Sequence, residues 1–516
     1  MEKTDLPQLL AMKAPEFNIE DVDGAEYMLD HRMEGCFCFV CTKKIGSMEN
    51  ARALLREGDK NIRIISEICN VGPFRETIVG LCLQPVLTEY DKDYHILIQG
   101  IVDEDGNEMQ PMEYCLHTRP KAGEEPRYEK RDQVTLKVAR EGIVLLKMRS
   151  MCFPICTRGK NQCFLEVVLQ KFRIGASGAG RINPRYQIRL FEGIENYTSL
   201  KINPELRKFY AEATDTLPEE DVLKRAVDYA DTAILALTRG TSENFDNLAF
   251  KGEFYLTDEE ERLIEKVSRT FSHTVLLLNT GYPVDVRCVE KYGIDAVLWT
   301  GLCGMNGGRA VAEILAGTVN PSGKLPDTWS LTWEEIPSSR NFYQPETPQE
   351  RISGGCEKYI DTLYEEGLYI GYRYFDTFKK KTAYSFGHGL SYTTFEFSAR
   401  DVKWSKPATL DEAAVQICVS VTNTGDRAGK EVVQLYAQLP EKKLEQPFRR
   451  LAGFAKTKLL QPGECQELKL TINGRELASF DMENASWICE EGEYRLLQEI
   501  HWKTAWRFPA GSWMKR

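Results

Sequence analysis

The chain has 516 residues, of which 42% are apolar, 10% aromatic and 28% charged, and its formal net charge is -11. This composition is that of a folded protein and excludes the highly charged, weakly hydrophobic class of disordered chains. At about 100 to 200 residues per domain the length predicts three or more domains. Because nucleic-acid affinity rests on clustered Lys and Arg, the acidic balance argues against a nucleic-acid partner and favours a neutral or polar small substrate.

The N-terminal segment and the cysteines predict the compartment. Met1–Phe17 has neither a basic start followed by an apolar core nor a cleavage site, and no run approaches the roughly 20 apolar residues of a membrane span. We therefore expect a cytoplasmic protein that does not insert into a membrane. Fifteen cysteines, an odd number, favour reduced thiols over a disulfide framework. The loose groups Cys36–Cys41 and Cys152–Cys163 lack the matched ligand pairs of a zinc site, so neither a metal nor a cofactor is expected.

Residues 1–130 are the least regular part of the sequence. Ala51–Ile68 has helical character, whereas Ile78–Leu87 and Tyr94–Val102 are apolar runs typical of strands. Asp105-Gly106-Asn107 predicts a turn that opens a hairpin. These patterns predict a small β-rich α+β domain of unknown role.

A linker and then a different pattern follow. Arg119–Arg131 is rich in Pro, Gly and charge, as linkers are. From Val134 onward helices alternate with short, wholly apolar strands, which predicts a mostly parallel sheet covered on both faces, with ligands at the carboxyl ends of its strands. The predicted helices are Val134–Lys147, Val222–Ala230, Asp258–Arg269 and Gly308–Ala316, and the strands are Leu165–Leu169, Thr232–Leu237, Thr274–Leu278 and Ala296–Trp299.

The last part of the chain has a period-two pattern. Its turns fall at regular spacing, which predicts an antiparallel β-sandwich over residues 397–500, a scaffold or interaction module, followed by a tail at 501–516. The clearest strands are Val415–Val421, Glu431–Gln438, Glu467–Ile472 and Gly492–Leu497.

Several motifs occur in one order. They are Val138–Lys147 (VAREGIVLLK), Thr318–Pro326 (TVNPSGKLP), Tyr364–Phe375 with Phe386–Thr393 (FGHGLSYT), and Asn423–Gly425 with Gly429–Tyr436 (GKEVVQLY). This series resembles the non-barrel half of glycoside hydrolase family 3, over residues from about 134 to 497. The first motif resembles the helix that opens this half in the family. The resemblance implies an α/β sandwich domain at 131–345, a connector at 346–396 and a fibronectin-III-like domain at 397–500.

These motifs also have a structural explanation. Pro321 and Gly323 suit a tight turn after a helix, Gly387 and Gly389 permit backbone geometry that other residues resist, and Tyr372 is expected to pack. We therefore expect them to identify the family without carrying its chemistry.

The chemistry is expected in Arg239–Asn247 (RGTSENFDN), directly after the apolar strand that ends at Leu237. A carboxylate in a loop at the carboxyl end of a parallel strand is where an α/β site is expected. The loop is similar to the family's Arg-x-x-Gly-Glu-x-x-Asp-Asn, which implies that Glu243 is a general acid/base. Asp246 is the carboxylate nearest to it, and Arg239 and Asp246 are predicted substrate contacts. The alternative is that Glu243 is a solvated loop acid.

A second loop, Gly175–Arg181 (GASGAGR), follows the strand predicted at Leu165–Leu169. Its glycine spacing also suits a phosphate, although no Lys-Ser/Thr pair completes a P-loop. A similar loop lies beside the sugar pocket in the family, so the resemblance implies that Ser177 and Arg181 contact substrate.

The chain also departs from the family. Retention of configuration needs two carboxyls about 5 Å apart, and the family carries its nucleophile, an Asp, on a (β/α)8 barrel for which residues 1–130 are too few. Where relatives show Gly-Glu-Gly-Gly or Met-Glu-Gly-Gly, this chain has Gly304–Gly308 (GMNGG), an amide in place of an acid, and Asn244 follows Glu243 where glycine or a charged residue is common.

Three explanations of the missing barrel stay open at this stage. The barrel sits on a separate polypeptide, the chain is a fragment or split gene product, or the protein is a catalytically silent relative. The leading hypothesis is a retaining, β-glucosidase-like enzyme acting on a carbohydrate or aryl glycoside, with Glu243 as acid/base and a (β/α)8 barrel chain as partner. The alternatives are an inactive carbohydrate-binding subunit and an assembly protein.

Overall fold

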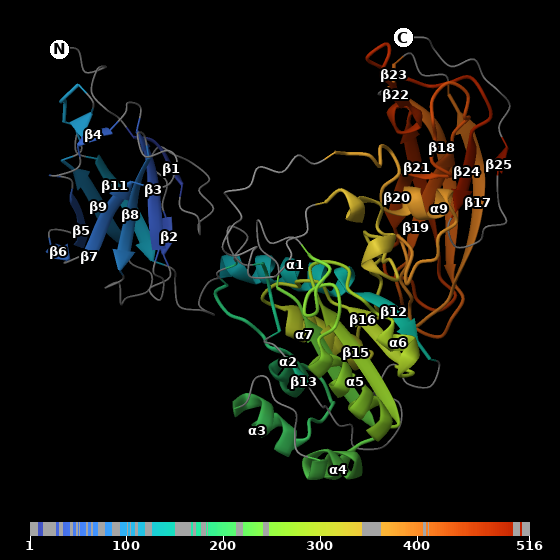
Figure 1. The fold of residues 1–516 in the computed structure, drawn as a ribbon, viewed down its shortest axis with the longest axis horizontal. Coiled ribbons are helices and arrows are strands. Elements are labelled where there is room, and N and C mark those ends of the chain that lie inside the picture. The colour runs from blue at the N-terminus through green and yellow to red at the C-terminus, as the bar shows by residue number, and fades with distance from the viewer. Residues whose placement is uncertain are drawn as a thin grey trace. The chain divides into compact units, whose positions relative to one another are not determined.

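Figure 1 shows a computed structural model of the protein, which describes part of its residues. These residues are 9–13, 27–29, 35–41, 45–47, 50, 52–57, 60–62, 65–70, 78–84, 93–100, 102–103, 105–108, 112–118, 126–149, 167–168, 172–176, 182, 184–212, 220–240, 247–342, 363–405, 409–410, 412–498 and 506–507. The chain divides into two compact units, Met1–Gln133 with Ser177–Gln187, and Val134–Ala176 with Ile188–Arg516.

The first unit is built from β-strands, as the sequence predicted for this region. One sheet has the order β1-β3-β8-β7, a second has the order β2-β11-β9-β5-β6, and β10 pairs with β4. The strands are β1 (Leu9–Lys13), β2 (Tyr27–Leu29), β3 (Gly35–Cys41), β4 (Ile45–Ser47), β5 (Arg52–Glu57), β6 (Lys60–Ile62), β7 (Ile65–Asn70), β8 (Ile78–Gln84), β9 (Asp93–Gln99), β10 (Val102–Asp103) and β11 (Met112–Thr118).

The predicted helix at Ala51–Ile68 is wrong, because these residues form β5, β6 and most of β7. The segment contains good helix formers such as Ala, Leu, Arg and Glu, which misled the prediction. In the structure β5 pairs antiparallel with β9 over five positions, from Arg52–Gln99 to Arg56–His95. Pairing with a strand about 40 residues away in the chain therefore overrides the local preference. The turn predicted at Asp105–Asn107 is confirmed, with Gly106 at a φ of 82°.

The predicted boundary between linker and helix is also corrected. Helix α1 spans Pro126–Gly142, so the last part of the predicted linker is its first turn, and Pro is well suited to that position. The predicted helix at Val134–Lys147 ends at Gly142, and Val144–Met148 is strand β12. The run Ile143–Leu146 is fully apolar and buried, which suits a strand covered on both faces better than a helix with one exposed side. The motif that resembled a helix is thus a helix followed by a strand.

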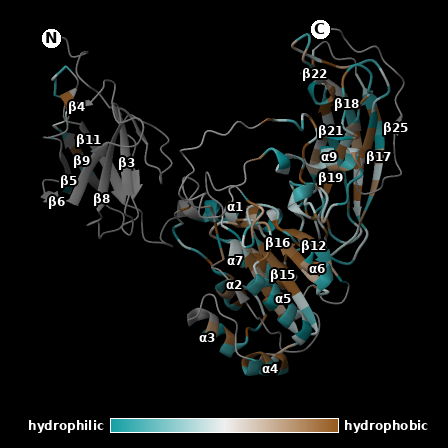
Figure 2. Ribbon diagram, in the orientation of Figure 1, coloured by the Kyte–Doolittle hydropathy of each residue, from teal (hydrophilic) through white to brown (hydrophobic). Residues whose placement is uncertain are grey.

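The mostly parallel sheet is confirmed, with the strand order β12-β16-β15-β14-β13. β13 (Val167–Val168), β14 (Thr232–Thr238), β15 (His273–Asn279) and β16 (Ala296–Trp299) are parallel, and only β12 is antiparallel. Figure 2 shows β15 and β16 as markedly hydrophobic ribbons among more polar helices.

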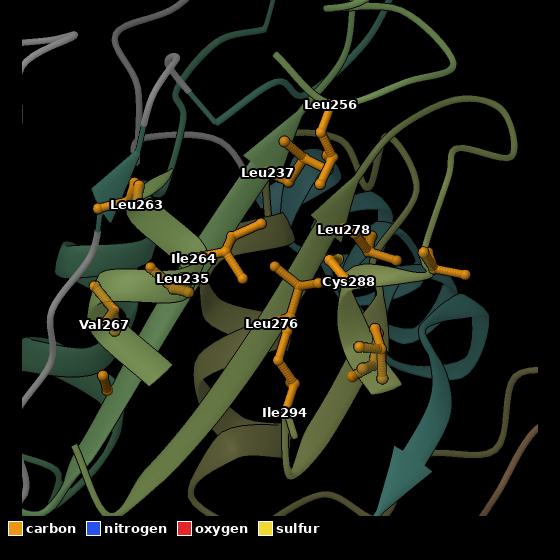
Figure 3. Packing of buried hydrophobic residues seen from close by; sticks show 14 of the residues in the cluster. Leu235, Leu237, Leu256, Leu263, Ile264, Val267, Leu276, Leu278, Cys288 and Ile294 are labelled. Atoms are coloured by element: carbon orange, nitrogen blue, oxygen red, sulfur yellow. The ribbon is translucent and has the colours of Figure 1, made fainter. Parts of the chain in front are cut away.

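Helices cover both faces of this sheet. Side chains alternate along each strand, so that Leu235 and Leu276 join a core with α4 (Glu220–Tyr229) and α5 (Asp258–Thr270). Ile234 and Leu277 join a second core with α1, α2 (Leu190–Tyr197) and α7 (Gly307–Leu315). Figure 3 shows the first core, where Leu263, Ile264 and Val267 of α5 face the leucines of β14 and β15. The helices are α2 (Leu190–Tyr197), α3 (Pro204–Glu212), α4 (Glu220–Tyr229), α5 (Asp258–Thr270), α6 (Cys288–Lys291) and α7 (Gly307–Leu315), followed by the short η4 (Trp333–Glu335), η5 (Pro337–Arg340) and α9 (Tyr372–Thr377).

The C-terminal part is the predicted antiparallel β-sandwich. Its two sheets have the orders β17-β18-β21 and β20-β19-β24-β25. Alternate residues of β18, which are Val415, Ile417 and Val419, meet Leu435 of β19 from the other sheet in one core. The elements are β17 (Phe395–Trp404), β18 (Ala413–Asn423), β19 (Val432–Gln438), β20 (Arg450–Lys456), β21 (Cys465–Asn473), η6 (Gly474–Leu477), β22 (Ser479–Asp481), β23 (Ser486–Ile488), β24 (Arg495–Gln498) and β25 (Trp506–Arg507).

The motif segments around Gly323 and Gly389 lie beside each other and are joined by backbone hydrogen bonds. The Leu325 N–H donates to the His388 carbonyl at 2.8 Å, and the Gly387 N–H donates to the Leu325 carbonyl at 2.8 Å. A Cβ on Gly389 would lie 2.2 Å from the Gly323 carbonyl oxygen, so no larger residue fits there. Gly389, and Gly387 with a φ of 80°, therefore have the structural role that was expected of them, whereas residues 321–325 do not form the tight turn expected at Pro321 and Gly323.

Ion pairs and the Asn320 amide connect the α/β domain to the β-sandwich. Asn320 accepts from the Tyr392 N–H at 2.8 Å and donates to the Ala428 carbonyl at 3.0 Å. Lys324 pairs with Glu431 at 2.7 Å, with both side chains largely buried. Glu141 at the end of α1 pairs with Lys430 at 2.5 Å and Lys456 at 3.3 Å.

Candidate functional site

The carboxyl ends of the parallel strands meet at one edge of the sheet. Thr238 of β14 lies beside Asn279 of β15, and Leu278 lies beside Trp299 of β16. The loops that follow these three neighbouring strands therefore start close together at this edge. In sheets of this kind ligands bind outside the carboxyl ends of the strands, which makes this edge the candidate site.

Asn279 fixes the loops at this edge. Its side chain is completely buried and exchanges two hydrogen bonds with the Arg173 backbone, accepting from the N–H at 2.6 Å and donating to the carbonyl at 3.0 Å. It also donates to the Gly301 carbonyl at 2.6 Å, and its own backbone carbonyl accepts from the Arg239 N–H at 3.1 Å. One buried residue thus connects the chain after β13, β14 and β16. A polar residue that ends the apolar run of β15 was the signal that the sequence analysis missed.

Arg239 lies at this edge, but its guanidinium points into the protein. Its side chain is 2% exposed and forms a two-pronged ion pair with Glu260, at 2.6 and 2.7 Å. The same guanidinium donates to the Glu253 and Thr238 carbonyls, each at 2.9 Å. Arg239 therefore anchors the end of β14 to the first turn of α5. Contact between Arg239 and a substrate stays a prediction.

Glu260 has a second role at the start of α5. It accepts from the Thr257 N–H at 2.9 Å, while its own N–H donates to the Thr257 hydroxyl at 3.1 Å. This reciprocal pair is a capping box, which satisfies N–H groups that a helix start leaves unpaired. This helix was predicted from the sequence, whereas Glu260 was not singled out.

The other predicted site residues, Glu243, Asp246, Ser177 and Arg181, lie outside the described residues. The described residues that flank the loop of Glu243 are firmly held. Asn247 donates to the Pro283 carbonyl at 3.1 Å, and the Leu248 N–H donates to the Glu253 carboxylate at 3.0 Å. The roles of the four residues stay predictions.

The segment Gly304–Gly308, where an amide replaces the family's acid, begins α7. Asn306 is buried and donates to the Thr135 hydroxyl at 2.7 Å, a bond that an ionised carboxylate cannot make because it has no proton to donate. A Cβ on Gly308 would lie 2.4 Å from the backbone that precedes α2. This stretch is therefore a packing site for two helices.

Two further features were searched for in the part of the chain that is described. Among those residues, no three His, Cys, Asp or Glu side chains are grouped as metal ligands. None of the described helices is both long and apolar enough to cross a bilayer.

Comparison with known families decides the relationship. Residues 143–392 match the glycosyl hydrolase family 3 C-terminal domain, and residues 431–498 match a fibronectin type III-like domain. The chain therefore carries a C-terminal domain of glycoside hydrolase family 3, followed by a fibronectin type III-like domain. The family 3 match runs through the predicted connector, and the predicted limits at 345, 396 and 500 stay predictions.

Proteins named as β-glucosidases are similar to this chain over about 70% of its length. β-Glucosidase A of Butyrivibrio fibrisolvens is 35% identical over 421 residues, which cover 71% of this chain and 49% of that protein. Thermostable β-glucosidase B of Acetivibrio thermocellus is 32% identical over 364 residues, 70% of this chain and 45% of that protein. The structure of β-glucosidase 3B from Thermotoga neapolitana in complex with glucose matches with a TM-score of 0.65 and 34% identity, over 75% of this chain and 55% of that one. The chain thus spans about half the length of these relatives.

Proposed function

We propose that this chain supplies one half of the active site of a retaining β-glycosidase, with Glu243 as the general acid/base. The observation that carries the proposal is the position of the Glu243 loop in the chain, directly after a parallel strand of a family 3 domain. The named relatives are β-glucosidases, so a β-glucoside is the proposed substrate.

The proposed reaction has two steps. Glu243, in its protonated form, donates its proton to the glycosidic oxygen while a second carboxylate attacks the anomeric carbon and forms a glycosyl-enzyme bond. The leaving alcohol departs with that proton. Glu243, now ionised, removes a proton from water as the water attacks the anomeric carbon and releases the sugar.

The second carboxylate is proposed to lie outside residues 1–516, on a (β/α)8 barrel. Such a barrel alternates strands with helices. In the described residues before Pro126 every element is a strand, so that part of the chain does not have the pattern of a barrel. The chain and a family 3 barrel together would then provide the two carboxyls, about 5 Å apart, that retention requires.

The test is hydrolysis of p-nitrophenyl β-glucoside by the chain combined with a family 3 barrel. The Glu243→Gln substitution should reduce turnover about 100-fold or more, because general acid/base catalysis contributes at least about that factor. Azide needs no general base, so it should restore part of the second step in this variant and yield a glycosyl azide. The matched control is Glu259→Gln, which removes a carboxylate that is 67% exposed on α5 and should leave turnover unchanged.

A second candidate function is a sugar-binding subunit without turnover. It is favoured by the coverage, since the chain matches only about half of each catalytic relative. Sugar binding that persists in the Glu243→Gln variant, with no turnover when the barrel is added, would support this candidate and exclude the catalytic one.

A further inference from the structure

Arg173 lies at the carboxyl edge of the sheet, in the stretch that follows β13. Its backbone N–H and carbonyl are both held by the buried Asn279 amide. The next residue is fixed as well, because the Ile174 carbonyl accepts from the Gly304 N–H at 2.9 Å. The main chain that carries this arginine is therefore rigidly positioned beside the ends of β15 and β16.

The Arg173 guanidinium lies against Gly240, two residues after the end of β14. A Cβ built on Gly240 would be 3.0 Å from the guanidinium carbon and 3.2 Å from each terminal nitrogen. A residue with a side chain would therefore require the guanidinium to shift by a few tenths of an ångström. Glycine at position 240 allows the charged group to cross the start of the loop at close range.

This guanidinium has no counter-charge in the part of the chain that is described. Its Nε is buried without a hydrogen-bond acceptor, and none of the described carboxylates forms an ion pair with it. The acids on neighbouring segments are engaged elsewhere, since Glu260 pairs with Arg239 and Asp285 pairs with Arg287. Because Nε is covered, an outside acceptor would reach this partly exposed side chain through its terminal nitrogens, and it would compensate a cation that no described carboxylate pairs with.

We infer that Arg173 is a ligand-binding residue, whose N–H groups donate to hydroxyl oxygens of a sugar bound at the carboxyl edge of the sheet. A guanidinium has five donors in one plane and no acceptor, so it suits a ligand with adjacent oxygen acceptors. Asn279 holds the main chain from which these donors extend. The inference rests on the proposed function for the class of ligand, and it adds a contact that the sequence analysis did not predict.

The test measures binding of methyl β-D-glucopyranoside to the full chain by titration calorimetry. Arg173→Met should weaken binding about tenfold or more, since one hydrogen bond to a charged group corresponds to at least that factor. The affinity of the Arg173→Lys variant should lie between those of the unchanged chain and of Arg173→Met, because lysine keeps the charge but lacks the planar set of guanidinium donors. Gly240→Ala should also weaken binding, since the added methyl group displaces the guanidinium while the charge remains.

The design separates a binding role from a folding role. Asn279 holds main-chain atoms of residue 173, so the substitutions at this position leave these hydrogen bonds in place. Equal melting temperatures of the variants and the unchanged chain would confirm that the fold is intact. The matched control is Arg149→Met, at the opposite edge of the same sheet, where Arg149 is 55% exposed beside Asp295. This variant should bind the sugar as the unchanged chain does.

Three results would overturn the inference. They are equal affinity of the Arg173→Met variant and the unchanged chain, absence of binding by the unchanged chain, and an Arg173-dependent preference of about tenfold or more for methyl β-D-glucuronide, which would make a carboxylate the ligand group. None of these readouts measures turnover. If sugar binding depends on Arg173 but Glu243→Gln does not alter hydrolysis with the barrel, the inference stands and the proposed acid/base role fails.

Discussion

Replacing Arg239 by Met should destabilise the α/β domain strongly. The substitution removes the guanidinium that forms two hydrogen bonds with the Glu260 carboxylate, and Glu260 is only 5% exposed. Only the Thr257 N–H then remains, among the described residues, as a donor to this carboxylate. Breaking a buried ion pair from one side typically costs about 3–5 kcal/mol, because the remaining charge is buried without compensation.

The double variant Arg239→Met, Glu260→Met isolates this cause. Removing both charges eliminates the uncompensated carboxylate, although the capping contact with Thr257 is also lost, at about 1 kcal/mol. We expect the double variant to lose at least about 2 kcal/mol less stability than the sum of the losses of the two single variants. The matched control is Arg262→Met on the same helix, whose pair with Glu259 is exposed and should be worth about 0–1 kcal/mol.

Hydrogen exchange of peptides from β14 and α5 is the appropriate assay, because a chain with several domains does not unfold in one step. A loss of less than about 1 kcal/mol in the Arg239→Met variant, or a loss equal to that of Arg262→Met, would refute the reasoning. If Arg239 served only to contact substrate, Arg239→Met would weaken sugar binding at unchanged stability.

Other features predict further outcomes. Gly308→Ala should destabilise the α/β domain by about 1–3 kcal/mol, as hydrogen exchange of peptides from α7 would measure, since its methyl group would lie 2.4 Å from the backbone before α2, and unchanged exchange would contradict this. Burial raises the pKa of Cys288 to about 12, so iodoacetamide at a pH of about 8 should modify exposed Cys465 and spare Cys288, as mass spectrometry would detect. Burial opposes ionisation of Glu141, but Lys430 and Lys456 lower the pKa of its carboxyl overall. The ionised Glu141 therefore stabilises the folded protein fully above its unfolded pKa of about 4.3, and this contribution is lost as the pH falls through the lower folded pKa. Glu141→Gln should consequently make unfolding less sensitive to acid, and identical pH profiles of the two proteins would contradict this.

Local patterns in the sequence predicted much of the fold. The strands β14, β15 and β16 were recognisable because burial on both faces gives a continuous apolar run, and those of the β-sandwich because burial on one face gives a period of two between turns. Ala51–Ile68 was mispredicted because its strands are stabilised by partners far away in the chain. The end of α1 at Gly142 was missed because a short apolar run fits a helix or a strand equally well.

The candidate site was less accessible to sequence reasoning. The pairing of Arg239 with Glu260 joins residues 21 positions apart, and no local pattern reveals it. Asn279 and Arg173 act through a contact across 106 positions, which only the fold brings together. Glu243 was found from the position of its loop after an apolar strand together with the resemblance to the family, and its role stays a prediction.

The most direct test of the account is the product formed from p-nitrophenyl β-glucoside by the chain together with a family 3 barrel. The account predicts β-glucose as the first product, a sharp loss of turnover in the Glu243→Gln variant, and formation of β-glucosyl azide when azide is added to that variant. Turnover that is unchanged by Glu243→Gln, or no turnover by the combined chains, would contradict it.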